Sequence, residues 1–107
     1  MSSIRYSQRG GAAIGSRSAG WPFGRIEISA DSVTVRVMGK AKTLRVAEVL
    51  RVEPLGFLAT YEGPGVLIFF RGQHWEEFVD FYSTTGHGEV LGELRNAGFK
   101  VVEKRGS

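Results

Sequence analysis

The side chains that could support acid–base or metal chemistry are few and lie apart along the chain. The two histidines are His74 and His87, and neither has a second histidine or a carboxylate at metal-ligand spacing on a regular element. The chain contains no cysteine, so neither a thiolate zinc site nor a disulfide framework can form. We therefore expect no metal and no cofactor, with surface or capping roles for both histidines.

The acidic and hydroxyl side chains do not form a catalytic pattern either. Glu76, Glu77 and Asp80 are an acidic cluster, but carboxylates that alternate with aromatic residues more often form the solvent-facing side of an element. The hydroxyl run at residues 83–85 has no nucleophile signature and no acid or base placed to activate it. The segment Gly86-His-Gly is too short for a phosphate-binding loop. We predict no catalytic residues and no enzyme activity.

Basic residues indicate a different chemistry, which is the binding of an anion. One stretch between Asp31 and Glu48 carries four basic residues and no acid, and these are Arg36, Lys40, Lys42 and Arg45. Such a patch could hold a phosphate through charge-assisted hydrogen bonds. The alternative is a solvated turn in which Arg36 pairs with Glu27.

The net charge of +3 belongs to the first 20 residues, which contain Arg5, Arg9 and Arg17 and no acid. The remainder carries eleven basic and eleven acidic residues and is neutral. Residues 1–20 are dominated by Ser, Gly, Ala and Arg and have no periodic apolar face, which predicts a disordered basic tail. Because the rest of the chain is neutral, we expect no nucleic-acid partner.

The elements that position these residues begin with a hairpin. Residues 25–30 and 33–38 both alternate strictly between apolar and polar side chains, which predicts two paired strands around a turn at Asp31-Ser32. In this register Ile28 faces Val35, Ile26 faces Val37, Glu27 faces Arg36 and Ser29 faces Thr34. A slip of one residue would set each apolar side chain against a polar one, so the faces are well specified.

A second hairpin is predicted from residues 57–62 and 66–71, around Gly63-Pro64-Gly65. Both of its faces are apolar, so each must be covered by the protein or by a partner. One face carries Phe57, Ile68 and Phe70, and the other carries Leu58, Leu67 and Phe69. Between the two hairpins, residues 42–46 and 49–53 predict two shorter strands, the second ended by Pro54 and Gly56.

Residues 75–82 have aromatic side chains at helical spacing but also suit a strand. We favour the strand, because the hydroxyl run at residues 83–85 is typical of the start of a separate helix. That helix has an apolar stripe formed by Val90, Leu91, Leu94 and Ala97. Gly98 is placed to end it in a left-handed conformation, with Phe99 packing back on Leu94.

About seven short strands followed by one helix form the layout of the pleckstrin-homology (PH) superfold. The chain resembles the small bacterial PH-like domains in the entry strand Trp21-Pro-Phe-Gly-Arg-Ile-Glu-Ile, in residues 33–37 and in Val90-Leu-Gly-Glu-Leu-Arg-Asn-Ala-Gly-Phe-Lys-Val. The resemblance covers residues 21–102 and leaves residues 1–20 and 103–107 as tails. It implies a mainly β domain of two bent antiparallel sheets capped by one C-terminal helix.

The resemblance also implies binding of peptides, proteins or phosphoinositides, with self-assembly in some bacterial members. Phosphoinositide-binding members carry clustered basic residues on the loop between their first two strands. Here that loop is Ala30-Asp31-Ser32, which is short and acidic, so the resemblance does not support inositol-phosphate binding there.

The sequence predicts a cytoplasmic protein, because residues 1–11 lack the apolar run of a signal peptide and no segment approaches the roughly 20 apolar residues of a spanning helix. Its predicted function is that of a non-catalytic PH-like interaction module acting through protein–protein contact. The face with Leu58, Leu67 and Phe69 is expected to meet a partner or a second copy in a homo-oligomer. The alternative is an anion- or lipid-headgroup-binding module, with peripheral lipid contact, that uses Arg36, Lys40, Lys42 and Arg45. A third possibility, an enzyme, would need a deep polar pocket.

Overall fold

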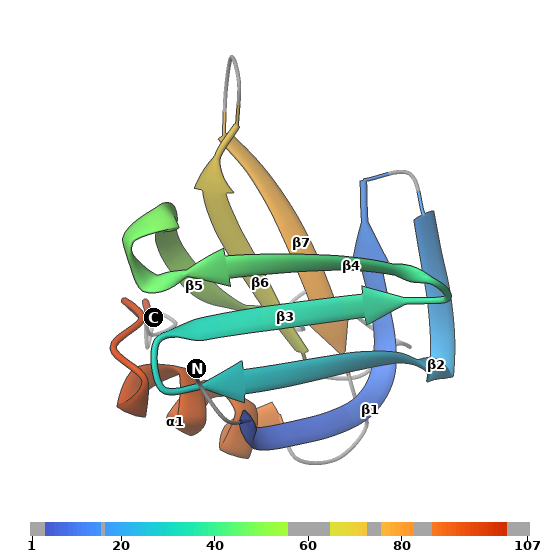
Figure 1. Cartoon of the computed structure of the whole chain (residues 1–107), viewed down its shortest axis with the longest axis horizontal. Helices are drawn as coiled ribbons and strands as arrows, with labels where there is room; N and C mark the ends of the chain where they lie inside the picture. The colour runs from blue at the N-terminus through green and yellow to red at the C-terminus, as the bar shows by residue number, and fades with distance from the viewer. Residues whose placement is uncertain (1–3, 16, 56–64, 73–75, 83–86, 103–107) are drawn as a thin grey trace, which may run out of the picture.

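The computed structural model describes residues 4–15, 17–55, 65–72, 76–82 and 87–102. In these residues seven strands form one antiparallel sheet, and a helix follows near the C-terminus (Figure 1). The elements are β1 (Ile4–Ile14), β2 (Arg17–Ser29), β3 (Ser32–Val37), β4 (Lys40–Arg45), the 3-10 turn η1 (Val46–Glu48), β5 (Val49–Leu55), β6 (Gly65–Arg71), β7 (Glu76–Tyr82) and α1 (His87–Asn96).

The strand order is β4-β3-β2-β1-β7-β6-β5, so β1 joins two groups of strands. β1 pairs with β2 along most of its length, while its last residues also pair with β7. Figure 1 shows β2, β3 and β4 crossing in front of β5, β6 and β7, with α1 at one end. The sheet therefore folds over on itself and has two outer faces around one core.

The core contains the apolar side chains that alternate along each strand. Two residues of α1, Val90 and Leu94, are also fully buried against it. Each buried Val, Ile or Phe side chain stabilises the fold by about 1.5–3 kcal/mol relative to exposure. The strand residues of the core are Ala12, Ile14, Ile26, Ile28, Val33, Val35, Val37, Leu44, Val52, Val66, Ile68, Phe70, Val79 and Phe81.

The prediction of a disordered tail at residues 1–20 is wrong for the part of that segment that the structure describes. β1 occupies the middle of the sheet, and the domain therefore begins before Trp21. The cause is close packing, because a Cβ atom at Gly10 would lie 2.3 Å from the carbonyl oxygen of Tyr82 and 2.8 Å from the Phe81 ring. Small residues are required where β1 passes β7, and they make the strand resemble a linker in composition.

The first hairpin is confirmed, but its register differs from the predicted one by two residues. Ile26 pairs with Val35 and Ile28 with Val33, so the turn lies at Ala30-Asp31. A shift of two residues leaves every side chain on its predicted face, which is why the alternation could not distinguish the two registers. Glu27 and Arg36 still meet, as a diagonal pair with a distance of 3.0 Å from Nε to Oε1.

The predicted second hairpin is wrong in its pairing. β6 pairs with β5 on one side and with β7 on the other, so Ile68 lies between Val52 and Val79. Both edges of β6 are therefore occupied by other strands, and residues 57–62, which include Leu58, lie outside the described residues. The strands predicted at residues 49–53 and 66–71 are confirmed.

The strand that we favoured for residues 75–82 is also confirmed over its described residues, as β7. α1 ends as predicted: Gly98 has a φ of 101°, and the N–H of Phe99 donates to the carbonyl oxygen of Leu94 at 3.0 Å. The chain then runs beside β5. The N–H of Val52 donates to Lys100, and the N–H of Val102 donates to Val52, both at 2.8 Å.

Candidate functional site

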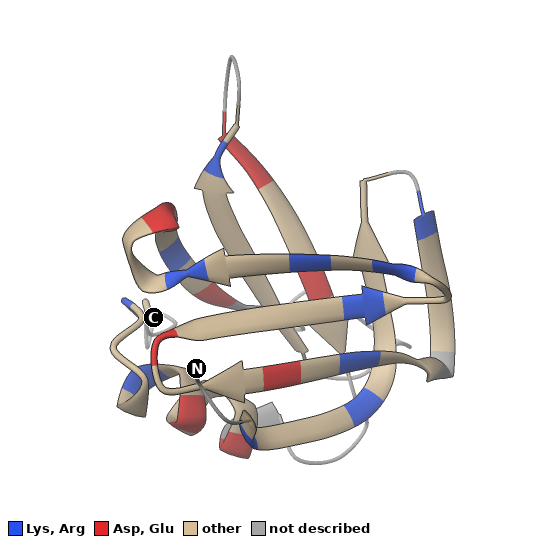
Figure 2. Ribbon diagram, in the orientation of Figure 1, with Lys and Arg blue, Asp and Glu red and all other residues tan. Residues whose placement is uncertain are grey.

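Three arginines lie side by side across three neighbouring strands. The register pairs Arg9 of β1 with Arg25 of β2, and Arg25 with Arg36 of β3. Residues directly opposite each other point to the same side of a sheet, and neighbouring strands lie about 4.8 Å apart. The three side chains, which we call the arginine row, therefore share the outer face of β1–β4. Figure 2 shows blue Lys and Arg positions along these strands.

The alternation of the strands fixes this row on the outer side. Ile26 and Val35 point into the core, so their neighbours Arg25 and Arg36 must point outward. Arg9 is exposed and precedes Gly10, whose position is held by the close approach of β7. The same packing that builds the core thus places the row.

The arginine row has little negative charge around it. Arg36 pairs with Glu27, and Nη1 of Arg25 donates to the hydroxyl of Ser7 at 3.2 Å. Within the described residues, Arg9 has no ion pair. Like charges directly opposite each other on a sheet are destabilising, so this arrangement favours a bound anion.

Two exposed apolar side chains lie close to the row in sequence. Phe23 lies two residues before Arg25 on β2 and is 62% exposed. Met38 is also 62% exposed and lies in the turn between β3 and β4. Met38 and Gly39 have φ values of 38° and 89°, as a two-residue type I′ turn requires. Arginines and exposed apolar side chains on the same strands and turn suit a surface that offers both phosphate and hydrocarbon.

The structure divides the four predicted anion-binding residues between two sides of β4. Arg36 and Arg45 lie on the outer face, because Arg45 pairs with Ser32 of β3. Lys40 and Lys42 point to the other side, where they line a cleft. The arginine row was missed at the sequence level, because Arg9 was assigned to a tail. Arg25 could have been found from the alternation that placed Arg36.

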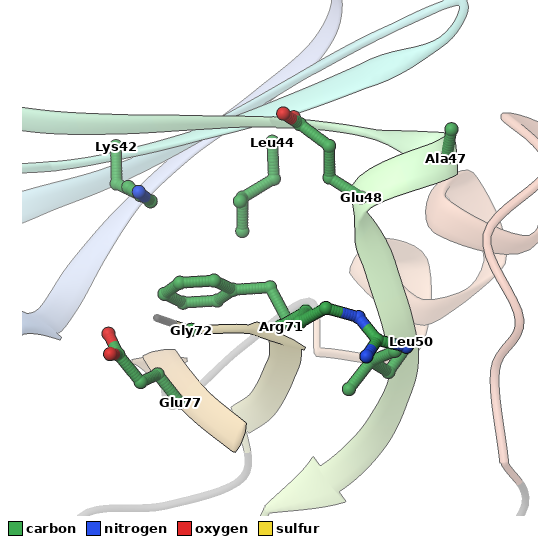
Figure 3. A pocket seen from close by; sticks show the side chains of 9 residues that line it. Lys42, Leu44, Ala47, Glu48, Leu50, Arg71, Gly72 and Glu77 are labelled. Carbon is green, nitrogen blue, oxygen red and sulfur yellow. The ribbon is translucent and has the colours of Figure 1, made fainter. Parts of the chain in front are cut away.

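A first cleft, lined by Lys42 but not by Lys40, lies between β4 and the ends of β6 and β7 and has a volume of about 620 Å³. Figure 3 shows Lys42 and Glu77 pointing into it from opposite walls. The ammonium of Lys42 lies 4.8 Å from the centre of the Phe70 ring. A second cleft, of about 570 Å³, shares Lys42, Phe70 and Glu77 with the first, so together they form one groove that runs past β4.

The outer face of β5–β7 carries two of the predicted interface residues, Leu67 and Phe69. Leu67 and Phe69 are half-buried there, whereas Ile68 and Phe70 belong to the core. Phe69 packs against Phe78, which is 50% exposed, with ring centres 5.5 Å apart. This apolar patch therefore comes from β6 and β7, and Leu58 lies outside the described residues.

Arg51 lies over this patch and is held by two carboxylates. It donates to Glu76 through two bonds of 2.9 and 3.0 Å and to Glu53 at 2.7 Å, and its guanidinium lies 4.1 Å from the centre of the Phe69 ring. These hydrogen bonds raise the pKa of Arg51 and lower the pKa of Glu76. The charge of Arg51 is therefore compensated within the protein.

Two other ionisable groups are perturbed by burial. Burial raises the pKa of Asp80, whose Oδ1 has no hydrogen-bond partner among the described residues. The pKa of Tyr6 is raised, first by burial and then by the hydrogen bond that its hydroxyl donates to Glu89 of α1 at 3.2 Å. In the described part of the chain no three His, Cys, Asp or Glu side chains are placed to hold a metal ion.

Comparison with known proteins supports the fold alone. No family model and no curated protein matches the chain. Among solved structures, the C-terminal domain of an unknown protein from Leishmania infantum has a similar fold, with a TM-score of 0.69. The match covers 90% of this chain and 84% of that chain at 8% sequence identity. Within the described residues, no helix is long and apolar enough to cross a bilayer.

Proposed function

We propose that this protein is a non-catalytic PH-like interaction module that docks on anionic membrane surfaces through the outer face of β1–β4. The observation that carries the proposal is the arginine row, in which Arg9, Arg25 and Arg36 lie directly opposite one another. The strand order and the C-terminal helix support the PH-like assignment.

The shape of the row suits the plane of a membrane better than a single small anion. The three arginines span two strand spacings, about 10 Å, on a sheet surface. Each guanidinium can donate two parallel hydrogen bonds to a phosphate, so the row can engage several headgroups at once. The side chains of Phe23, two residues before Arg25, and Met38, two residues after Arg36, are exposed and can enter the boundary between headgroups and acyl chains.

The expected affinity is modest. A basic residue near an anionic membrane contributes about 1 kcal/mol. The arginine row and Arg45 supply four positive charges on the outer face, and Glu27 supplies one negative charge, so the net charge is +3. This predicts about 3 kcal/mol of attraction, or roughly 100-fold in affinity. In the cytoplasmic location that we propose, the facing leaflet is the one that carries anionic lipid.

The test is co-sedimentation with phosphatidylcholine vesicles that either contain or lack phosphatidylserine. We expect binding only with phosphatidylserine, and weaker binding as salt shortens the Debye length. Arg25→Glu should abolish most of it, whereas Lys100→Glu, the same change on an exposed residue beside β5, should not. Equal binding to neutral vesicles would contradict the proposal. Binding to a single-stranded oligonucleotide but not to vesicles would replace it with a nucleic-acid function.

A second candidate function, contact with another copy of the chain, is favoured by the exposed Phe78 packed on Phe69. An exposed apolar patch of this kind is a usual mark of an interface. Sedimentation velocity should then show a dimer that Phe78→Ser dissociates. A strictly monomeric protein at high micromolar concentration would end this candidate.

A further inference from the structure

Within the described residues, no segment pairs with the outer edge of β4, which is the first strand of the sheet order. The other end of the sheet, β5, is bridged at Val52 by the residues that follow α1. An unpaired edge offers backbone N–H and C=O groups to an additional strand. The edge of β4 is therefore a place where another chain can pair.

The register shows which groups of β4 are available. In a hairpin with a two-residue turn, the residues that flank the turn form a hydrogen-bonded pair, and bonded pairs alternate with non-bonded ones. Val37 and Lys40 flank this turn, and the N–H of Val46 continues the pattern by donating to Asp31 at 3.0 Å. The backbone groups of Ala41, Thr43 and Arg45 consequently point away from β3.

One of these three residues is already engaged. The N–H of Arg45 donates to the Oε1 of Glu48 at 2.8 Å. The backbone groups of Ala41 and Thr43 remain for an incoming strand, which would run along the groove described above. Its side chains would alternate between the groove, lined by Lys42 and Leu44, and the outer face.

We propose that the edge of β4 binds an acidic extended segment of a partner protein by strand addition. The charge of the edge selects this occupant, because β4 carries Lys40, Lys42 and Arg45 and no acid. Lys42 would occupy a non-bonded position opposite the new strand, where paired Cα atoms are closest, at about 4.5 Å. A Glu in that position gains an opposite-charge cross-strand pair.

A second copy of the chain is a poor occupant of the same edge. Two β4 strands would bring their lysines and arginines together, and charged side chains on edge strands normally prevent such pairing. Glu77 points into the groove from the opposite wall (Figure 3). The acidic side chain of the partner must therefore lie next to β4, beside Lys42.

The probe is the capped peptide Thr-Val-Thr-Glu-Thr-Glu-Thr, with a matched peptide in which Lys replaces both Glu residues. In an antiparallel pairing its Val meets Leu44 and its two Glu residues meet Lys42 and Lys40. We expect binding of the acidic peptide alone, with slower hydrogen exchange at the amides of Ala41 and Thr43 measured by NMR. Binding without slower exchange at these two amides would overturn the proposal.

Three variants distinguish strand addition from charge attraction. Thr43→Pro removes an N–H that does not bond β3, so it should keep the fold and weaken binding about tenfold. Thr43→Val keeps that N–H and should bind within about twofold of the wild type. Lys42→Glu should exchange the preference from the acidic to the lysine peptide, and it tests the proposal even if Thr43→Pro fails to fold. Equal affinity of all variants for the acidic peptide would contradict the proposal. So would a dimer that forms as the protein concentration rises and that only Lys42→Glu makes tighter.

Discussion

The two outer faces of the sheet differ in whether their arginines are paired with carboxylates. On β5–β7, Arg51 is bound by Glu53 and Glu76 and covers the ring of Phe69. On β1–β4, Arg9 and Arg25 lie opposite each other with no carboxylate bonded to either among the described residues. On β5–β7 the positive charge of the arginine is neutralised within the fold. On β1–β4 the positive charges of Arg9 and Arg25 remain available to an external anion.

The difference arises from cross-strand register. On β6 and β7 the register sets Arg71 opposite Glu76, a pairing of opposite charges that stabilises a sheet. On β1, β2 and β3 it sets arginine opposite arginine twice. A fold selected only for stability would not favour the second pattern, which is why we place the binding function on this face.

The largest predicted effect concerns β1, which joins the two faces. Gly10→Val places a side chain where even a Cβ atom would lie 2.3 Å from the backbone oxygen of Tyr82. We expect destabilisation of about 3 kcal/mol or more, measured by urea unfolding. The control is Gly92→Ala, in the open space on α1, which should stabilise the protein by about 0.5–1 kcal/mol. If Gly10→Val leaves the free energy of unfolding unchanged, the prediction of a disordered tail is restored.

That prediction shows where sequence reasoning stops. Strict alternation in residues 25–37 predicted the β2–β3 hairpin, and Gly98-Phe99 predicted the end of α1, because both patterns are local. β1 was not predicted, because its small residues are required by the close approach of β7, which lies far along the chain. Its apolar pattern is visible only once that neighbour is known.

The candidate site was only partly predictable for the same reason. Arg36 was identified from a stretch of sequence without acids, but its true neighbours, Arg25 and Arg9, come from two other strands. Lys42 was grouped with it, although strand alternation sends the two side chains to opposite sides. A linear patch of charge therefore indicates an anion site only after strand pairing is known.

The next effect compares one arginine from each face. Arg25→Glu changes the charge of the outer face of β1–β4 by two, which predicts about 2 kcal/mol and roughly 30-fold weaker vesicle binding. Arg51→Gln should leave vesicle binding unchanged and lower the Tm, because Glu53 and Glu76 lose their partner. Binding by co-sedimentation and Tm by calorimetry separate the two roles. Loss of vesicle binding in Arg51→Gln would show that the faces do not differ in function.

A smaller effect is expected from Glu27, the acid paired with Arg36. Glu27→Gln keeps the shape of the side chain and removes the negative charge, so vesicle affinity should rise about fivefold. The ion pair lies at the surface, with the Arg36 side chain 53% exposed, so its loss should cost less than about 1 kcal/mol in stability. Unchanged affinity would mean that the membrane does not contact Arg36.

The smallest effect concerns Asp80, which pairs with Leu67 on the outer face of β5–β7 and, unlike Arg51, is perturbed by burial. The backbone N–H of Ala13 donates to this carboxylate and lowers its pKa, but desolvation by burial is the larger influence, so the pKa lies above its usual value of 3.8. The folded state therefore binds the proton more tightly than the unfolded state, and Asp80 opposes stability increasingly as pH rises through this range.

Asp80→Asn removes the charge and keeps an acceptor for Ala13. Its Tm should exceed that of the wild type at neutral pH, and the difference should shrink as pH falls toward about 4. The pKa of Glu76 is lowered, so its stabilising contribution is lost in acid, but equally in both proteins, and it cancels in the comparison. A difference that stays constant with pH would assign the effect to packing rather than to charge.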